Sequence, residues 1–106
     1  DAIITPKGSN LTIASGAITV TTSYSRVDTE ASAASDDLDT INGGVDGQRL
    51  VLSAAAGART VVVKDGAGNI RTAGDFSLDN TQDTIELIFN GSVNEWYEIS
   101  RSDNGA

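Results

Sequence analysis

Residues 84–89 read TIELIF, and this stretch shows the secondary structure of the chain most clearly. Ile85, Leu87 and Phe89 alternate with single residues. They therefore share one face of an extended strand, because successive side chains of a strand point to opposite faces. Thr, Val and Ile, which suit a pleated surface, are frequent throughout the chain. TIELIF is predicted to be a strand with one apolar face.

Two earlier stretches alternate in the same way, namely RLVLS at Arg49–Ser53 and TVVVK at Thr60–Lys64. On the second stretch Val62 faces away from its two neighbours. A run that is apolar on both faces indicates a strand buried on both sides. Together with TIELIF, these stretches define a predicted core or intersubunit seam that consists of Leu50, Leu52, Val61, Val63, Ile85, Leu87 and Phe89.

Shorter strand-like stretches fill most of the remaining chain, separated by turns rich in Gly, Asp and Asn. They occur at Leu11–Ile13, Ala17–Thr21, Tyr24–Thr29, Ile70–Thr72, Phe76–Leu78 and Trp96–Ser100. Strands spaced about ten residues apart are typical of all-β sandwiches, barrels and solenoids. No exact internal repeat is present. The predicted fold is all-β, with short strands in a sandwich, a barrel or an intertwined trimeric β-structure.

The stretch Glu30–Asp39 (EASAASDDLD) departs from this pattern. Ser35 or Asp36 is suited to cap a short helical turn that brings Leu38 and Ile41 to one face. A solvated loop is the alternative interpretation.

Composition excludes several classes of function. The chain has 106 residues, 7 Lys+Arg and 15 Asp+Glu, for a formal net charge of -8. We therefore expect neither nucleic acid nor membrane as a partner, since polyanions repel an acidic chain. No apolar run approaches the ~20 residues of a spanning helix. Because Met is absent, we expect a processed or partial chain.

Cys and His are both absent, which removes disulfides, thiolate nucleophiles, imidazole bases and Cys/His zinc sites. We expect no enzyme and no cofactor. Aromatic residues make up only 5% of the chain, so its few bulky side chains favour self-association to complete the core.

Carboxylates are the main remaining candidates for chemistry. Glu95 and Glu98 flank Trp96 and Tyr97, but in a strand the two acids fall on opposite faces, which does not suit a glycosidase pair. The two aromatic residues have two interpretations: packing in the core or a subunit contact, or a stacking surface for a glycan.

Two groups of acidic residues are candidates for calcium, which prefers several oxygen ligands on a tight loop. The alternative is that these side chains cap their own backbone in turns. The candidates are Asp36, Asp37, Asp39 and Asp46 in one group, and Asp79, Asn80 and Asp83 in the other.

The run from Ile18 to Asn104 resembles a domain that recurs in tailed-bacteriophage and prophage virion proteins, near fibres, spikes and surface-decorating proteins. The resemblance rests on DGQRLVL (46–52), on VVVKDGAGNIRTAGDFSLDNTQDT (61–84) and on WYEISRS (96–102). It implies a β-rich, trimeric block of a virion exterior without catalytic residues. For this chain it implies a homotrimeric capsid decoration protein or short head fibre, with a tail-fibre or adhesin module that binds host glycans as the alternative.

On this interpretation the chain divides into an N-terminal extension, residues 1–16, and a β domain, residues 17–106. The extension is expected to grip the major capsid protein, another virion protein or a neighbouring copy. Its candidate contact residues are Ile3, Ile4 and Pro6, and Pro6 suits an extended segment because it lacks an N–H group.

Overall fold

The computed structural model describes residues 4–105, which form eleven short strands and one 3₁₀ turn, η1 (Glu30–Ser32). The strands are β1 (Leu11–Thr12), β2 (Ala17–Thr19), β3 (Tyr24–Asp28), β4 (Ser35–Leu38), β5 (Thr40–Asn42), β6 (Arg49–Ala54), β7 (Thr60–Val63), β8 (Ile70–Arg71), β9 (Phe76–Leu78), β10 (Thr84–Asn90) and β11 (Glu95–Ser102). The all-β prediction is confirmed.

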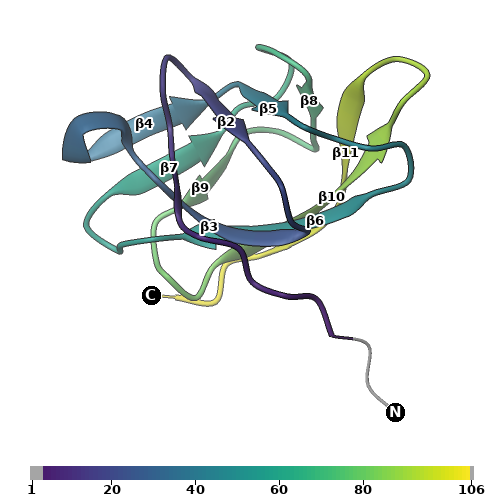
Figure 1. The fold of residues 1–106 in the computed structure, drawn as a ribbon. Coiled ribbons are helices and arrows are strands. Elements are labelled where there is room, and N and C mark those ends of the chain that lie inside the picture. Colours follow the sequence, from purple (N-terminus) through teal and green to yellow (C-terminus); the bar gives the residue numbers. More distant parts are fainter. Residues whose placement is uncertain (1–3, 106) are drawn as a thin grey trace.

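Within residues 4–105 the strands form three sheets that pack around a common interior (Figure 1). The largest sheet has the order β1-β3-β6-β10-β11-β8. A three-stranded sheet has the order β4-β7-β9, and β2 pairs with β5 in the third. The packing is sandwich-like, with short strands joined by turns.

Two successive passes of the chain lie against each other in parallel. The first pass runs through β2, β3 and β4, and the second runs through β5, β6 and β7. Each strand of the second pass pairs in parallel with the corresponding strand of the first. This parallel stacking of one pass on the other was not visible as a repeat in the sequence, because the two passes differ in loop length and in side chains.

The next strands of the chain run antiparallel to the second pass. β9 pairs antiparallel with β7, and β10 pairs antiparallel with β6. β11 then returns along β10, with a bulge after Glu98 that leaves Ile99 outside the regular register. The chain therefore ends in the antiparallel hairpin β10–β11 and does not add a third parallel pass.

The interior is a hydrophobic core completed by the single chain. Every residue predicted for the core or seam is buried, and most are fully shielded. The core also contains Trp96, together with Ile13, Ile18, Leu38, Ile41, Ile70 and Leu78. These residues are thus core residues of one subunit, and self-association is not required to cover them.

Three expectations need correction. Ser35–Leu38 is neither a helical turn nor a loop but strand β4, held by parallel pairing with β7. Val62 is only half-buried, since one face of β7 is partly open. The extension does not reach residue 16: β1 pairs with β3 and Ile13 is fully buried, so this segment belongs to the β domain.

Within the described residues, no helix has the length and apolar character needed to cross a membrane.

Candidate functional site

The six-stranded sheet has an outer face that points away from the core. On β6, β10 and β11, the side chains that alternate with the core residues point away from the interior. Ile88 lies opposite Arg49 on one side and Tyr97 on the other, and Val51 lies opposite Glu86. Val51 and Ile88 are half-buried and Tyr97 is 37% exposed. This set of residues, Val51, Ile88 and Tyr97, is called the outer apolar row below.

A hollow of about 540 Å³ lies on the same face, lined by Thr5, Ser23, Arg49, Val51 and Glu86. Arg49 and Glu86 form a loose ion pair across it, with nitrogen and oxygen 3.8 Å apart. Thr5 belongs to the N-terminal extension, so the extension borders the sheet face where it leaves the body of the molecule.

Arg26 and Ser53 lie at one end of this face and are directly opposite each other on β3 and β6. Ser53 is 3% exposed, and its hydroxyl has no hydrogen-bond partner among the described residues. The Nε of Arg26 is likewise shielded from water and unpaired. Buried polar groups are nearly always hydrogen-bonded, so these two adjacent atoms are exceptions among the described residues.

Trp96 is fully buried, so the interpretation of Trp96 as a glycan-stacking surface is wrong. Its ring packs against Phe89 with centroids 4.9 Å apart, and its indole N–H donates to the carbonyl of Ile41 at 3.1 Å. Tyr97, the next residue, points to the opposite face of β11. The sheet therefore separates the two aromatic residues that are adjacent in sequence.

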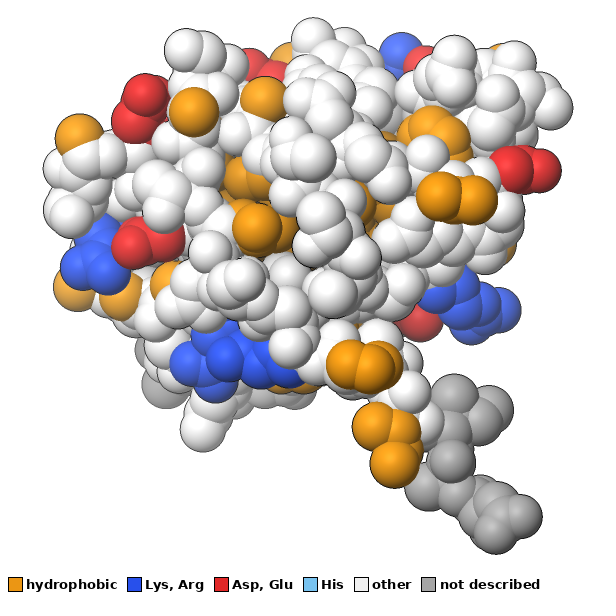
Figure 2. Space-filling model, in the orientation of Figure 1, with side chains coloured by type: hydrophobic (Ala, Val, Ile, Leu, Met, Phe, Trp, Pro, Cys, Tyr) orange, Lys and Arg blue, Asp and Glu red, His pale blue; other side chains and the backbone are white. Residues whose placement is uncertain are grey.

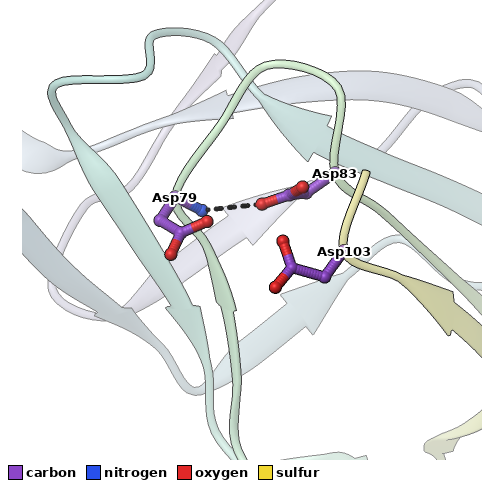
Figure 3. A group of neighbouring side chains, drawn as sticks. All are labelled: Asp79, Asp83 and Asp103. Carbon is purple, nitrogen blue, oxygen red and sulfur yellow. Dashed lines mark hydrogen bonds between the residues drawn. The ribbon is translucent and has the colours of Figure 1, made fainter. Parts of the chain in front are cut away.

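Three carboxylates meet near the C-terminal end of the described chain: Asp79, Asp83 and Asp103 (Figure 3). One oxygen of each lies within 4.8 Å of the others. Asp83 is fully buried and accepts hydrogen bonds from the backbone N–H groups of Asp79 (3.2 Å) and Gly105 (2.9 Å). We call this group the acidic cluster.

The carboxyls of the acidic cluster shift each other's pKa. Hydrogen bonding to Asp83, and the charge of Asp83, raise the pKa of both Asp79 and Asp103. Burial opposes ionisation of Asp83, but the N–H of Gly105 and the two neighbouring carboxyls outweigh it and hold the pKa of Asp83 below its ordinary value. Such oxygen ligands suit a hard cation, although calcium takes six to eight oxygens and the cluster offers three carboxylates.

The sequence predicted only part of this cluster. Asp79 and Asp83 were candidates, whereas Asp103 enters from the far end of β11, beyond the reach of a local pattern. Asp36 and Asp46, from the other proposed group, bind backbone instead: Asp36 accepts from the N–H of Glu30 and Asp46 from that of Gly91, both at 2.8 Å. For these two residues the capping interpretation fits the structure.

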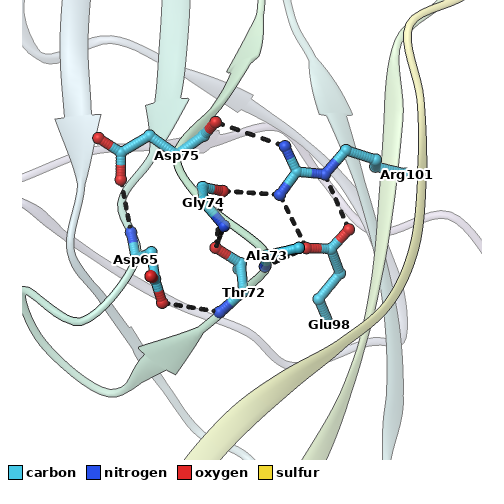
Figure 4. A network of polar contacts seen from close by, with 7 residues as sticks. All are labelled: Asp65, Thr72, Ala73, Gly74, Asp75, Glu98 and Arg101. Carbon is cyan, nitrogen blue, oxygen red and sulfur yellow. Dashed lines mark hydrogen bonds and ion pairs between the residues drawn. The ribbon is translucent and has the colours of Figure 1, made fainter.

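A polar network fastens the loop after β8 to β11 (Figure 4). Arg101 binds both oxygens of Glu98 at 2.8 Å, donates to the carbonyl of Gly74 and lies 4.8 Å from the ring centre of Phe76. Glu98 also accepts from the N–H of Ala73. The guanidinium lowers the pKa of Glu98, although burial opposes it. Because the charged groups of the network bind each other, we interpret the network as stabilising the fold and not as a binding site.

Glu95 and Glu98 do not act as a pair. Glu95 binds Arg71 at 2.6 Å, while Glu98 binds Arg101 within the network. Each carboxylate is neutralised by its own arginine, on opposite faces of β11, as the sequence spacing predicted.

The described part of the N-terminal extension projects from the body and carries hydrophobic side chains (Figures 1 and 2). Ile4 is 80% exposed and Pro6 is exposed. Ile3, the third residue predicted for attachment, lies outside the described residues. The extension is held to the sheet from Gly8 onward, where its N–H donates to the carbonyl of Tyr24 at 2.7 Å.

Comparisons with protein-family models, with curated proteins and with solved structures give no match for this chain.

Sequence reasoning did not single out Arg26 or Ser53. Alternation in YSRVD already places Arg26 on the face opposite Ser25 and Val27. What sequence alone lacks is the register, which decides that Arg26 meets Ser53 and that both are shielded from water.

Proposed function

We propose that this chain is a structural protein of a bacteriophage virion exterior, a homotrimeric capsid decoration protein or short head fibre. The run from Ile18 to Asn104, with its resemblance to phage surface domains, supports the proposal. In the structure this run forms one continuous β body with many hydrogen-bonded turns. Such a body suits a particle surface because the chain, which has no Cys, builds its hydrophobic core without disulfides.

The outer apolar row is the observation that carries the proposal. Ile88 and Tyr97 lie side by side on β10 and β11, Val51 lies diagonally from Ile88 on β6, and all three remain partly open although the core is complete. A face that combines apolar, aromatic and arginine side chains is typical of protein interfaces. Copies of the chain would therefore associate through this face, and not by sharing a core as the composition suggested.

The N-terminal extension is the second contact of the proposed protein. Ile4 is almost fully exposed, and an apolar side chain held away from the body is suited to insert into a groove of another virion protein, such as the major capsid protein. The strong negative charge of the chain keeps free copies apart in solution until such specific contacts form.

Host-glycan binding is the second candidate, now centred on Tyr97 in place of Trp96. Tyr97 is exposed beside the ion pair of Arg71 and Glu95, which offers hydrogen-bonding groups next to an aromatic face. Replacing Tyr97 with Ala should abolish retention on a glycan column if this candidate holds, and unchanged retention would overturn it.

Two measurements test the main proposal. Sedimentation equilibrium of the purified chain should show a trimer whose population rises with concentration. Electron cryomicroscopy of particles that carry the chain should place it at regular sites on the exterior. A monomer at all concentrations, or a location inside the particle, would overturn the proposal.

A further inference from the structure

The N-terminal extension leaves the body of the molecule with its apolar side chains uncovered. Ile4 is 80% exposed, and Pro6 is exposed as well. Within the described part of the chain, residues 4–7 make no backbone–backbone hydrogen bond, and the first such bond comes from the N–H of Gly8. An extended segment that offers apolar side chains together with free backbone groups has the form in which many peptides bind a protein surface.

The sequence Thr5–Pro6 restricts the direction of this segment. Proline fixes its own φ angle, and it disfavours the helical region for the residue before it, which stays extended. Both restrictions oppose the tight reversal that would return Ile4 to the sheet of its own copy. Figures 1 and 2 show the described segment pointing away from the body. Ile4 therefore needs a second molecule to cover it.

The hollow on the outer sheet face offers a matching surface. It measures about 540 Å³, and Val51 of the outer apolar row is its apolar lining residue. Its polar groups are the hydroxyls of Thr5 and Ser23 and the ion pair of Arg49 and Glu86. The Arg49 side chain is 66% exposed, and its nitrogen lies 3.8 Å from the carboxylate, so its donors are open to a peptide carbonyl. The hollow thus suits an aliphatic side chain on an extended backbone.

Charge complementarity favours the extension of another copy as the occupant. The chain has a formal net charge of -8, so the bodies of two copies repel each other. Residues 4–10 contain Lys7 and no acidic residue. A copy that approaches with its extension therefore brings a positive charge toward Glu86 of the hollow.

The position of the hollow suits an exchange of extensions between copies. Gly8 is tied to the sheet, since its N–H donates to the carbonyl of Tyr24 at 2.7 Å. The four residues before Gly8 span at most about 14 Å, so Ile4 reaches only a hollow close to its own exit point. Thr5 lines the hollow of its own copy, which places exit point and hollow next to each other. One rotation axis beside them brings each extension to the hollow of the next copy.

We propose that residues 4–7 of one copy bind in the hollow of a second copy, with Ile4 against Val51. This inference rests on the proposed function, and it names a neighbouring copy, in place of a groove on another virion protein, as the partner of the extension. Each copy gives one extension and receives one. The contact is heterologous and closes into a ring in a trimer.

The first experiment compares self-association of the wild type, Ile4→Ser and Val93→Ser by sedimentation equilibrium. Val93 is the matched control, because it is 51% exposed in the turn between β10 and β11 and does not line the hollow. Ile4→Ser should raise the dissociation constant about tenfold or more, since the burial of an isoleucine side chain is lost. Val93→Ser should match the wild type.

The same comparison separates this contact from the proposed function. A wild type that associates while Ile4→Ser associates equally well refutes the contact alone and leaves the proposed function standing. A wild type that stays monomeric at all concentrations refutes both.

The second experiment uses the absence of Cys from the chain, because any disulfide then comes from introduced residues. The Ile4→Cys protein is mixed with the Val51→Cys protein and oxidised. A disulfide should join the two proteins, and a mixture of Ile4→Cys with Val93→Cys should form far less of it. Arg49→Cys, at an exposed position of the hollow, serves if Val51→Cys fails to fold. No disulfide in either mixture, although the wild type associates, overturns the inference.

The third experiment places Ile4→Cys and Val51→Cys in one chain, which distinguishes the hollow of the neighbour from that of the same copy. After oxidation, mass spectrometry should find the disulfide between chains, in covalent dimers and trimers. A monomer closed by a disulfide within the chain would show that the extension occupies its own hollow, and this result overturns the inference.

Discussion

The indole nitrogen of Trp96 donates a hydrogen bond to the carbonyl of Ile41 at 3.1 Å, across 55 positions of sequence. Ile41 belongs to the small β2–β5 sheet and Trp96 to the six-stranded sheet. The bond therefore ties two sheets together through the interior. A buried tryptophan with its N–H satisfied in this way contributes both apolar area and a fixed orientation.

Trp96→Phe should lower the free energy of unfolding by about 1–3 kcal/mol, since it removes this bond and leaves a void beside Phe89. Urea unfolding followed by circular dichroism measures the change. Tyr97→Phe is the matched control, because Tyr97 is exposed, and its effect should stay within about 0.5 kcal/mol. Equal stabilities of the two variants would contradict the buried position of Trp96.

Asn69 satisfies both backbone groups of Ile41. Its side-chain oxygen accepts from the N–H of Ile41 at 2.9 Å and its amide donates to the carbonyl at 2.8 Å, so it continues the edge of the β2–β5 sheet. Asn69→Ala should cost about 1–3 kcal/mol, because it leaves the N–H of Ile41 without a partner. Faster hydrogen exchange of the Ile41 amide by NMR should accompany the loss. Asn10→Ala, at an exposed position, should change neither quantity.

Gly44 lies against the aromatic pair in the core. A Cβ at this position would lie 2.6 Å from Cδ1 of Phe89 and 2.8 Å from Cζ2 of Trp96. Gly44→Ala should therefore destabilise the protein by about 1–3 kcal/mol through overpacking. Gly57→Ala meets no atom within 4 Å and should be neutral or slightly stabilising. Thermal unfolding of both variants measures the difference, and an unchanged midpoint for Gly44→Ala would argue against this packing.

The acidic cluster should make stability depend on pH. The folded structure raises the pKa of Asp103 above its ordinary value of 3.8, so ionised Asp103 destabilises the fold. This cost is present above the raised pKa and disappears as the pH falls below 3.8. Asp103→Asn, measured in dilute monomer, should raise the midpoint of thermal unfolding at pH 7 and have no such effect in acid.

Asp37→Asn is the control for the acidic cluster, because it removes the same charge at an exposed position outside the cluster. It should shift the midpoint less than Asp103→Asn at pH 7. If both variants stabilise the protein equally, the gain reflects net charge and not repulsion within the cluster.

The alternation of apolar residues along the sequence was enough to locate most strands. Alternation placed Leu50, Leu52, Ile85 and Leu87 toward the interior, because a side chain's face in a strand depends only on its position relative to its neighbours. The same rule put Trp96 and Tyr97 on opposite faces. It failed at Ser35–Leu38, where polar residues form a strand because β7 offers them a parallel partner, a contact that no local signal reports.

What the sequence determined by itself was the all-β class, the acidic character and the lack of disulfides, and the inward or outward direction of most residues on the strands that alternation predicted. Only the tertiary structure decided that one chain buries its own core, that Trp96 is interior, and that Asp103 joins Asp79 and Asp83. The reason is physical: direction follows from the geometry of the backbone over two residues, whereas register and neighbours follow from how segments distant in the chain pack against each other.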